Sequence, residues 1–367
     1  MISMATVTTT QLRHGLAALP SDYDDYVRAH PEATPYHRSA WLRAVDTSYQ
    51  HPVSVVVHTT NGRLDGILPL CRVIRPLGQG TLISLPFCDL CGPLADSYEI
   101  KCALLDRACQ ELGSDGQAPA SNTLVIRERG VAVDSNADDG VETGQKVSLL
   151  CPLPASADAM MAGFKPKLRS QIRKAEKNGL TASLSRSADA LSAFYDVYAA
   201  NMRRLGSPVH SRRWFAAIAA AYGDDMILGL VWKGSTVVGA GLVLFSGTQA
   251  VIPWASTRVE YNPLAPNMLL YWHLLSHACD RGCVQFDFGR STYGEGTYRF
   301  KRQWGAEPVA LRWQTLTTSG SWRDNSRQQA VSVTSRFLRP VLARAWQTLP
   351  LPLANTLGPR LRRYITL

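Results

Sequence analysis

The fold of this chain is decided by residues 226–245, MILGLVWKGSTVVGAGLVLF. Two apolar runs, Met226–Trp232 and Val237–Phe245, stand on either side of Lys233-Gly234. Short apolar runs bounded by turn residues are typical of paired strands. Outward from this hairpin the sequence predicts helices at Ala188–Met202 and Arg212–Tyr222, a strand at Ala250–Ser256, a helix at Asn267–Arg281 and a strand at Cys283–Phe288.

The same order occurs earlier in the chain. An Asn61-Gly62 pair lies between the apolar runs Val53–Val57 and Gly66–Val73, and this is the strongest short-range hairpin signal. The other elements expected here are a helix at Ser39–Tyr49, a strand at Thr81–Leu85, a helix at Tyr98–Leu112 and a strand at Thr123–Arg127. Helix, hairpin, third strand, helix, strand is the order of an acetyltransferase-type fold.

The predicted fold class is therefore α/β (α+β), with tandem acetyltransferase-like (GNAT-type) domains and a basic C-terminal helical tail. A chain of 367 residues suits two domains. We place the N-terminal domain at 1–150, the C-terminal domain, which carries the main motifs, at 151–318, and the tail at 319–367. Between the domains, the polar stretch Gly130–Lys146 is expected to be an exposed loop or linker.

Positive charge is concentrated in two places, although the net charge is only +10. From residue 323 onward there is one acidic residue, Asp324, against eight arginines: Arg323, Arg327, Arg336, Arg339, Arg344, Arg360, Arg362 and Arg363. Residues 165–177 hold one acidic residue, Glu176, against Lys165, Lys167, Arg169, Arg173, Lys174 and Lys177. Such local clusters indicate anionic partners at particular places.

The tail combines its arginines with apolar residues at helical spacing, and Pro350, Pro352 and Pro359 interrupt the pattern. A basic amphipathic tail packs on the body of the protein or lies on an anionic membrane surface. Packing is favoured, because proline-broken helices make poor surface anchors. No stretch reaches the roughly 18 apolar residues of a membrane span, and no signal peptide is indicated. We expect a cytoplasmic protein; a peripheral contact of the tail at the inner face of the membrane is the alternative to packing.

The cysteines and histidines predict neither a disulfide framework nor a metal site. Eight cysteines are irregularly spaced, and the pair Cys88 and Cys91 has no second pair to complete a zinc site. Cys279 and Cys283 lie near His273 and His277, but both histidines flank apolar positions of an expected helix. Packing therefore explains them better than metal ligation.

The first chemical motif is the segment 164–179, FKPKLRSQIRKAEKNG. Pro166 suits a first helical turn, and Gly179 suits the position just beyond a helix. Phe164, Leu168, Ile172 and Ala175 form one apolar stripe. The six cations occupy the other faces, where they fit the phosphates of a nucleotide-linked acceptor, a coenzyme or tRNA. A solvated helix face is the equally simple alternative.

The second motif is the segment 286–304, FDFGRSTYGEGTYRFKRQW. Phe286 and Phe288 alternate with Asp287 as on a half-buried strand. A glycine-rich loop follows that carries hydroxyl, guanidinium and carboxylate groups, and α/β enzymes place ligands at such loops. Asp287 is either a proton acceptor or a structural carboxylate that caps the Gly289 loop.

Three segments together resemble the FemAB-like N-acyltransferases: 286–308 (FDFGRSTYGEGTYRFKRQWGAEP), 167–179 (KLRSQIRKAEKNG) and 262–282 (NPLAPNMLLYWHLLSHACDRG). The similarity extends to the branch that accompanies exosortase/PEP-CTERM exopolysaccharide systems, and it includes the tail pattern LPLPLANTLGPRLRRY. It is specific across about residues 160–315 and looser over 35–130. The resemblance implies two acetyltransferase-like domains and transfer of an acyl or aminoacyl group to an amine of a cell-envelope or exopolysaccharide precursor.

The family's Phe-Lys-x-x-aromatic-Gly element falls on Phe300, Lys301, Trp304 and Gly305. We assign Lys301 and Arg290 to oxyanion or phosphate stabilisation, Asp287 or Glu295 to accepting the amine proton, and Tyr298 to donating one. The full set of expected site residues is Lys301, Asp287, Glu295 and Tyr298 for catalysis, and Arg169, Arg173, Lys174, Trp254, Ser256, Asn267, Arg290, Ser291, Arg299 and Trp304 for substrate binding.

The donor is open between acyl-CoA and aminoacyl-tRNA, and no permanently bound cofactor is expected. The segment 261–267, YNPLAPN, stands where a coenzyme-A-binding loop is expected, yet it has two prolines and no glycine. Proline lacks the N–H that such a loop needs. The chain also has no long insertion like the tRNA-binding arm of Fem-type enzymes. The partners expected are an anionic small-molecule or glycan precursor and tRNA.

Two other classes of function fit parts of the sequence. The charge clusters and nine tryptophans suit a nucleic-acid-binding module, but basic and aromatic residues are not interleaved along one strand face. The basic tail suits a non-catalytic, membrane-docking assembly protein of an exopolysaccharide or protein-sorting system.

Overall fold

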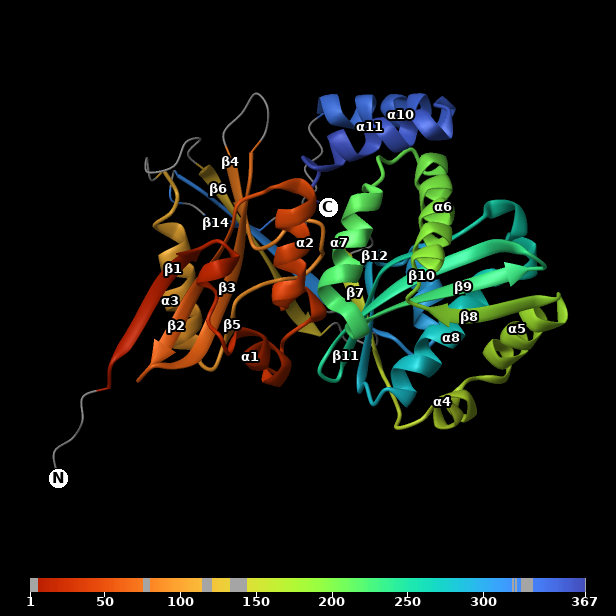
Figure 1. Ribbon diagram of the computed structural model, residues 1–367, viewed down its shortest axis with the longest axis horizontal. Helices are drawn as coiled ribbons and strands as arrows, with labels where there is room; N and C mark the ends of the chain where they lie inside the picture. Colours follow the sequence, from red (N-terminus) through yellow and green to blue (C-terminus); the bar gives the residue numbers. More distant parts are fainter. Residues whose placement is uncertain are drawn as a thin grey trace. The chain divides into compact units, whose positions relative to one another are not determined.

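The computed structural model describes residues 6–74, 80–113, 121–132, 144–318, 320, 322–324 and 333–366. The chain forms two compact units (Figure 1). The first comprises Met1–Gly130, Leu311–Gln329 and Tyr364–Leu367, and the second comprises Val131–Ala310 and Ala330–Arg363. Each unit thus contains pieces that are distant in sequence. The division of the chain into two contiguous repeated domains and a tail remains a proposal, with bounds at 1–150, 151–318 and 319–367.

The first unit has a sheet in the order β1-β2-β3-β4-β6, followed by the part of β13 that belongs to this unit. Strand β4 is parallel to β6, and the pairs β1-β2, β2-β3 and β3-β4 are antiparallel. The strands are β1 (Thr8–His14), β2 (Val53–Thr60), β3 (Arg63–Val73), β4 (Gly80–Ile83), β5 (Leu94–Ala95), β6 (Ser121–Ala132), β13 (Glu307–Thr317) and β14 (Trp322–Asp324). Asn61 and Gly62 have φ angles of 51° and 80°, so the predicted two-residue hairpin is confirmed.

Helix α3 (Tyr98–Cys109) packs on β1, β2 and β3, where Leu104 and Ala108 meet Val56 and Leu68 in one apolar core. Ser97 caps this helix by accepting a hydrogen bond from the Ile100 amide at 3.3 Å. Helices α1 (Tyr23–Ala29) and α2 (Ser39–Tyr49) contact β3 and β2 respectively. The short helices η1 (Leu16–Ala18) and η2 (Pro35–His37) complete the unit.

The second unit has a sheet in the order β13-β7-β12-β11-β10-β9-β8, in which only β11 and β12 are parallel. The strands are β7 (Lys146–Pro152), β8 (Leu180–Ser185), β9 (Met226–Lys233), β10 (Thr236–Ser246), β11 (Gln249–Thr257) and β12 (Gln285–Thr292). The hairpin of 226–245 is therefore confirmed as β9 and β10. Six described strands were not predicted, namely β1, β5, β7, β8, β13 and β14.

Helices cover this sheet on both faces: α6 and α7 on one face, and α5 and α8 on the other (Figure 1). The helices are α4 (Ala157–Gly163), α5 (Pro166–Lys177), α6 (Ala188–Arg204), α7 (Arg212–Tyr222), α8 (Pro266–Asp280) and α9 (Gly296–Arg302), with η3 (Gly223–Asp225) and η4 (Val259–Leu264) between them. In α5 the predicted apolar stripe is confirmed, because Leu168, Ile172 and Ala175 are buried.

The basic tail forms α10 (Val333–Thr348) and α11 (Leu351–Arg362), and both helices pack against α6. Pro340 and Pro359 lie inside these helices. The backbones approach closely: a Cβ on Gly206 would lie 2.7 Å from the Ala343 Cβ, and one on Gly358 would lie 2.8 Å from the Val209 Cγ2. Arg362 Nε contacts the Nε2 of the buried His210 at 3.0 Å. The structure therefore places the tail on the body of the protein.

The expected linker Gly130–Lys146 is shorter than predicted at both ends, since β6 continues to Ala132 and β7 begins at Lys146. Residues 133–143 of this stretch lie outside the described residues. Across the described ranges, no helix is both long enough and apolar enough to cross a membrane.

Candidate active site in the second unit

The parallel strands β11 and β12 part within the second unit. Their ladder pairs Gln249–Val251 with Gln285–Asp287 and ends there, although β11 runs on to Thr257 and β12 to Thr292. Each strand therefore carries an edge without ladder bonds on the side where it faces the other. Open α/β sheets bind ligands outside the carboxyl ends of their strands, where neighbouring strands separate. This position is our candidate active site.

A β-bulge shapes β12 where the two strands part. The register against β7 shifts between Asp287 and Arg290, and Gly289 has a φ angle of 69°. The Asp287 Oδ1 accepts a hydrogen bond from Ser148 Oγ at 2.6 Å and another from the Gly289 amide at 2.7 Å. These contacts are those of a structural carboxylate that caps the Gly289 loop. A role for Asp287 as proton acceptor stays a prediction.

Lys301, on helix α9, also binds the backbone of this β-bulge. Its Nζ donates to the carbonyl of Gly289 at 3.1 Å and to that of Arg290 at 3.0 Å. The side chain is 9% exposed, so these charge-assisted bonds form away from bulk water. Asp287 and Lys301 thus fix one short stretch of backbone, residues 287–290, from two sides.

An aromatic floor lies beneath α9. Tyr271 of α8 stacks on Phe288 with ring centroids 5.4 Å apart, and it meets Phe300 edge-on at 5.1 Å. Trp304 and Phe164 extend this cluster, with 5.6 Å between their centroids. Burial raises the pKa of the Tyr271 hydroxyl far above its ordinary value, so that group stays protonated at neutral pH. Phe300 and Trp304, from the sequence motif, therefore anchor α9 to the core.

A pocket of about 390 Å³ opens beside this floor, where α5 begins and α9 ends. Phe164, Leu168 and Trp304 line it together with polar and glycine residues, namely Gly163, Lys165, Lys167, Arg302, Gln303, Gly305 and Glu307. The Trp304 Nε1 is buried and meets no acceptor among the described residues.

The basic helix α5 supplies the positive charge near this pocket. Lys165 and Lys167 line it, whereas Arg169, Arg173 and Lys174 lie further along the helix. Within the described ranges none of the six cations of 165–177 is paired with an acidic side chain. Sequence reasoning chose Arg169, Arg173 and Lys174 as ligands; the structure brings the first two lysines of the cluster to the pocket instead.

The loop between β12 and α9 carries the remaining motif residues. Glu295 is exposed at the start of α9 without capping it, and Arg299 is exposed on the same helix. The Tyr298 and Tyr293 rings lie 4.8 Å apart, and partial burial, followed by Tyr293, raises the pKa of Tyr298. A raised pKa keeps the phenol protonated, as a proton donor requires.

Arg290 and Ser291 continue β12 beyond the bulge, opposite Ser148 and Val147 of β7. Arg290 is half-buried, and its backbone carbonyl is one of the two that Lys301 binds. Ser291 Oγ is buried and has no hydrogen-bond partner within the described ranges. Arg290 and Ser291 therefore belong to the same short segment, residues 287–301, as Asp287 and Lys301.

Trp254 and Ser256 face α6 and α7. The Trp254 ring lies 4.9 Å from Phe215 and 5.8 Å from His210, and Ser256 Oγ accepts a hydrogen bond from Asn201 at 3.2 Å. A register shift in β11, where Ile252 and Pro253 stand opposite the single residue Val243, turns these side chains to that face. The structure therefore does not bring Trp254 and Ser256 together with Lys301.

Helix α8 begins as its prolines predict. Ala265 lies in the left-handed region, with φ 64° and ψ 44°, and Pro266 is the first helical residue. The Met268 amide is bound to the Ala265 carbonyl at 3.0 Å, and Pro266 has no amide hydrogen. Asn267, an expected cleft residue, follows Pro266 and is half-buried. The start of α8 thus offers few free donors to a pyrophosphate.

Among the described residues, no group of three His, Cys, Asp or Glu side chains is arranged to hold a metal ion. The eight cysteines are unbonded, and burial raises the pKa of the Cys151 thiol to about 12. A thiol with such a pKa is a poor nucleophile at neutral pH.

Sequence reasoning missed Ser148 and the pocket beside α5. Ser148 lies on β7, a strand that was not predicted, and its pairing with Asp287 joins residues 139 positions apart. Phe164 and Arg302 were part of the quoted motifs, but nothing in their spacing shows that they line one pocket.

Comparison with known proteins agrees with this architecture. Residues 162–302 match the acetyltransferase (GNAT) domain family. The chain is similar to the crystal structure of FemX, with a TM-score of 0.62, 16% identity, and coverage of 88% of this chain and 98% of that one. It is also similar to a tandem GNAT protein from the clavulanic acid biosynthesis pathway, with a TM-score of 0.50, 13% identity, and coverage of 85% and 100%. A search of curated proteins found no match.

The fold is therefore that of tandem acetyltransferase-like domains, as the sequence predicted. At such low identity the two solved structures bear on the fold alone. The matched domain supports an amide-forming acyltransferase of the GNAT kind.

Proposed function

We propose that the protein is an N-acyltransferase that forms an amide on an amino group of a cell-envelope or exopolysaccharide precursor. The observation that carries the proposal is the parted pair β11 and β12, with Lys301 buried against the bulge of β12. The resemblance of 286–308 to the FemAB-like family, including its exosortase/PEP-CTERM branch, favours an exopolysaccharide precursor as acceptor.

In this proposal the acyl donor lies along the unpaired edge of β12 beyond Asp287. Backbone amide and carbonyl groups at such an edge hydrogen-bond an extended chain as a neighbouring strand would. The amine of the acceptor attacks the acyl carbonyl; a C–N bond forms and the bond from carbon to the donor's sulfur or oxygen breaks. Arg290 stabilises the oxyanion, and Lys301 keeps the bulge in the geometry that presents it.

The proton of the attacking amine passes to a carboxylate, and the leaving group takes up a proton. Glu295 is the more accessible of the two candidate acceptors, because Asp287 is 6% exposed and already accepts two hydrogen bonds. Tyr298 donates the proton to the leaving group, consistent with its raised pKa. Oxygen atoms of the substrates accept hydrogen bonds from Ser291, from Arg299 and from the indole N–H of Trp304.

The exposed cations of α5 bind an anionic part of one substrate. Arg169, Arg173 and Lys174 would contact phosphates beyond the pocket that Lys165 and Lys167 line. Both an acyl thioester of coenzyme A and an aminoacyl-tRNA carry such phosphates. The few free donors at Pro266 favour tRNA, since phosphates would then be bound by side chains and not by the start of α8.

The donor assay tests the proposal. Purified protein is incubated with glucosamine as acceptor and with either acetyl-CoA or a mixture of charged tRNAs, and amide formation is measured by mass spectrometry. An amide with either donor supports N-acyl transfer and identifies the donor. Melting curves with each donor alone give an independent readout, because ligand at 100 times its Kd adds about 2.7 kcal/mol of stability. Absence of both product and melting shift contradicts the proposal.

A second proposed role concerns the tail, which we infer to be a peripheral membrane contact. Val341 and Leu342 of α10 are 62% and 64% exposed, and Leu353 and Leu361 of α11 are 44% and 48% exposed. Exposed apolar side chains among arginines suit an anionic lipid surface. This observation favours membrane docking in addition to packing on α6.

Sedimentation with phosphatidylglycerol vesicles tests the tail. We expect binding of the wild type, with Val341→Asp/Leu342→Asp weakened about tenfold, because two apolar side chains are lost and two negative charges are added. Val284→Asp is the matched control, since Val284 is 55% exposed outside the tail. Equal binding of the double variant and the control would exclude tail docking. A wild type that stays in solution would exclude it as well.

A further inference from the structure

Two adjoining hollows lie in the first unit. Their volumes are about 280 and 630 Å³, and both are lined by Pro31, Glu32, Pro93 and Lys101. The smaller one lies between the segment that follows the parallel strand β4, the far end of β6 and the start of α3. Small-molecule sites have volumes of this order and occur where parallel strands end.

Glu128 is an unusual part of the wall of the smaller hollow. Its side chain comes from β6, and the residue is 6% exposed. Lys101 Nζ donates to its Oε2 at 3.0 Å, but the buried Oε1 has no donor in the described part of the chain. A buried carboxylate oxygen without a donor is costly, and native structures rarely leave one unmatched. Glu128 Oε1 is therefore an acceptor for which the described residues supply no donor.

The backbone beside Glu128 is shaped to accept that side chain. A Cβ on Gly92 would lie 2.8 Å from the Glu128 Cγ and 3.3 Å from the Arg127 carbonyl oxygen. Gly92 also accepts a hydrogen bond from His37 Nε2 at 3.1 Å, so the position of this stretch is fixed. The carboxylate is thus held in place by both of its neighbours, Gly92 and Lys101.

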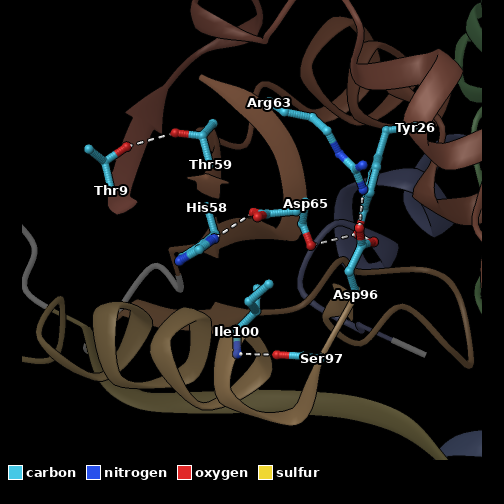
Figure 2. Close-up of polar contacts among 9 residues, drawn as sticks. All are labelled: Thr9, Tyr26, His58, Thr59, Arg63, Asp65, Asp96, Ser97 and Ile100. Carbon is cyan, nitrogen blue, oxygen red and sulfur yellow. Dashed lines mark hydrogen bonds and ion pairs between the residues drawn. The ribbon is translucent and has the colours of Figure 1, made fainter. Parts of the chain in front are cut away.

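The larger hollow also has a carboxylate in its wall, Asp96, but its partners are all present (Figure 2). Asp96 pairs with Arg63 at 2.7 Å and accepts from the Tyr26 hydroxyl at 3.1 Å. The same hydroxyl contacts the Asp65 carbonyl at 3.0 Å, and the Asp65 side chain is 2.5 Å from His58 Nδ1. Asp96 is thus bound by groups of the protein, whereas Glu128 Oε1 has no donor among the described residues.

We infer that these hollows bind a neutral, polyhydroxylated ring, a sugar unit, with a hydroxyl group donating to Glu128 Oε1. A neutral donor is favoured over an ammonium group because Lys101 already neutralises this carboxylate, and a second cation would repel it at close range. The Lys101 ammonium donates in turn to a sugar oxygen. Tyr98, 75% exposed at the rim, offers a ring face to the apolar side of the sugar. This site goes beyond the proposed acyl transfer and does not depend on it.

Titration calorimetry of the full chain with N-acetylglucosamine, without any acyl donor, tests the site. We expect binding by the wild type and about tenfold weaker binding by Glu128→Gln, which keeps a single acceptor oxygen for both Lys101 and the sugar. Glu99→Gln is the matched control, because Glu99 lies on the same helix as Lys101 but outside both hollows, and it should bind like the wild type.

Three results would overturn the inference: equal affinity of Glu128→Gln and the wild type, no binding of the sugar at millimolar concentration, or about tenfold tighter binding of glucosamine, which would identify a cation site. Circular dichroism checks that each variant is folded. If Glu128→Gln does not fold, Lys101→Met replaces it, because that side chain is 35% exposed, and it too should lose binding. Lys301→Ala should keep wild-type sugar binding, so failure of the acyl-transfer proposal is distinguishable from failure of this one.

Discussion

The segment that follows the first parallel strand differs between the two units. After β4, residues 84–88 and 90–94 are buried, and Leu85 and Phe87 adopt positive φ angles of 71° and 68°. After β11, residues 258–265 are half-buried or exposed, and a single alanine, Ala265, has a positive φ of 64°. The topology is shared, so the contrast shows what the side chains add to it.

In the first unit, hydrogen bonds hold bulky residues in an unfavourable backbone conformation. Each such residue costs about 1–3 kcal/mol, and it persists only where its surroundings force it. The buried Arg127 guanidinium donates to the carbonyls of Leu85, Cys88 and Thr366, at 3.4, 2.6 and 3.0 Å. In the second unit, Pro263 and Pro266 restrict the backbone of the corresponding segment. The side chain that binds two carbonyls there is Lys301, and those carbonyls belong to the next strand, β12.

The strongest test of this contrast is Arg127→Met. We expect the free energy of unfolding to fall by about 4 kcal/mol, because several buried carbonyls lose a charged donor. Urea unfolding followed by circular dichroism measures it. Arg28→Met is the control, since its ion pair with Asp25 is exposed and worth less than about 1 kcal/mol. A loss for Arg127→Met no larger than that of the control would show that the segment is held by burial alone.

A pH titration sharpens the comparison through His37, which bridges Gly92 and Thr34 in the first unit. Burial, then the nearby charges of Arg129 and His30, lowers the pKa of His37 to about 4. Because the folded pKa is below the unfolded value of about 6.5, the neutral ring stabilises the protein above pH 6.5. This contribution, on the order of 3 kcal/mol, is lost as the pH falls from about 6.5 to 4.

Urea midpoints measured between pH 7.5 and 4.5 for the wild type and His37→Gln check this. The variant is less stable at pH 7.5, because the flexible glutamine amide does not hold its oxygen and nitrogen where the two ring nitrogens of His37 meet the Thr34 amide and the Gly92 carbonyl. Its stability should fall less steeply with decreasing pH. In the second unit His210, whose pKa is lowered by burial and then by Arg362, contributes in the same direction and remains in both proteins. Parallel pH curves for the two proteins would contradict the role of His37.

Much of the fold was predictable from the sequence, because the apolar hairpins and the Asn61-Gly62 turn are local signals. Helix α5 and its buried stripe were equally accessible, since Pro166 and Gly179 mark its ends. Strands β7 and β13 were not, because their partners are distant in sequence: β7 lies between β12 and β13. The tail helices α10 and α11 contain prolines that a local rule places at helix ends, and packing on α6 overrides that rule.

The segment that forms the candidate site was predictable from the sequence, but the spatial arrangement of its side chains was not. The motif 286–304 contains Asp287 and Lys301, but the hydrogen bonds that both make to the backbone around Gly289 depend on a register shift against β7. Trp254 and Ser256 were assigned to the cleft, and the shift in β11 turns them toward α7 and α6. Register shifts reverse side-chain direction and leave no signature in the amino-acid order.

Lys301→Ala tests the bridging residue of the second unit. We expect a rate about 100-fold lower, or about 2.7 kcal/mol of lost transition-state stabilisation, because the bulge that carries Arg290 loses both of its bonds to the ammonium group. The measurement is amide formation with the donor identified in the assay proposed above, with kcat and KM determined separately. Lys233→Ala, which removes an exposed lysine on β9, should retain full turnover.

A folded Lys301→Ala protein with wild-type kcat and KM would remove Lys301 from the mechanism. If kcat falls and KM does not, the residue acts in the transition state; if only KM rises, it positions the donor. Lys301→Arg separates charge from shape, because its planar guanidinium cannot reproduce an ammonium group placed between two carbonyls. We expect it to recover less than a tenth of the lost rate if geometry is decisive.

The smallest expected effect is that of Ala265→Gly, which probes backbone strain in the more open segment of the second unit. An L-residue in the left-handed region costs about 1 kcal/mol, and glycine removes that cost while adding freedom to the unfolded chain. We expect a net stabilisation of about 0.5 kcal/mol, seen as a small rise in the urea midpoint. The same change at Ala255, on the extended strand β11, should instead destabilise by about 0.5 kcal/mol or more. If Ala265→Gly stabilises the protein and Ala255→Gly destabilises it, prolines, and not packing, hold Ala265 in place. If both variants lose stability by a similar amount, the segment after β11 is packed as firmly as the one after β4.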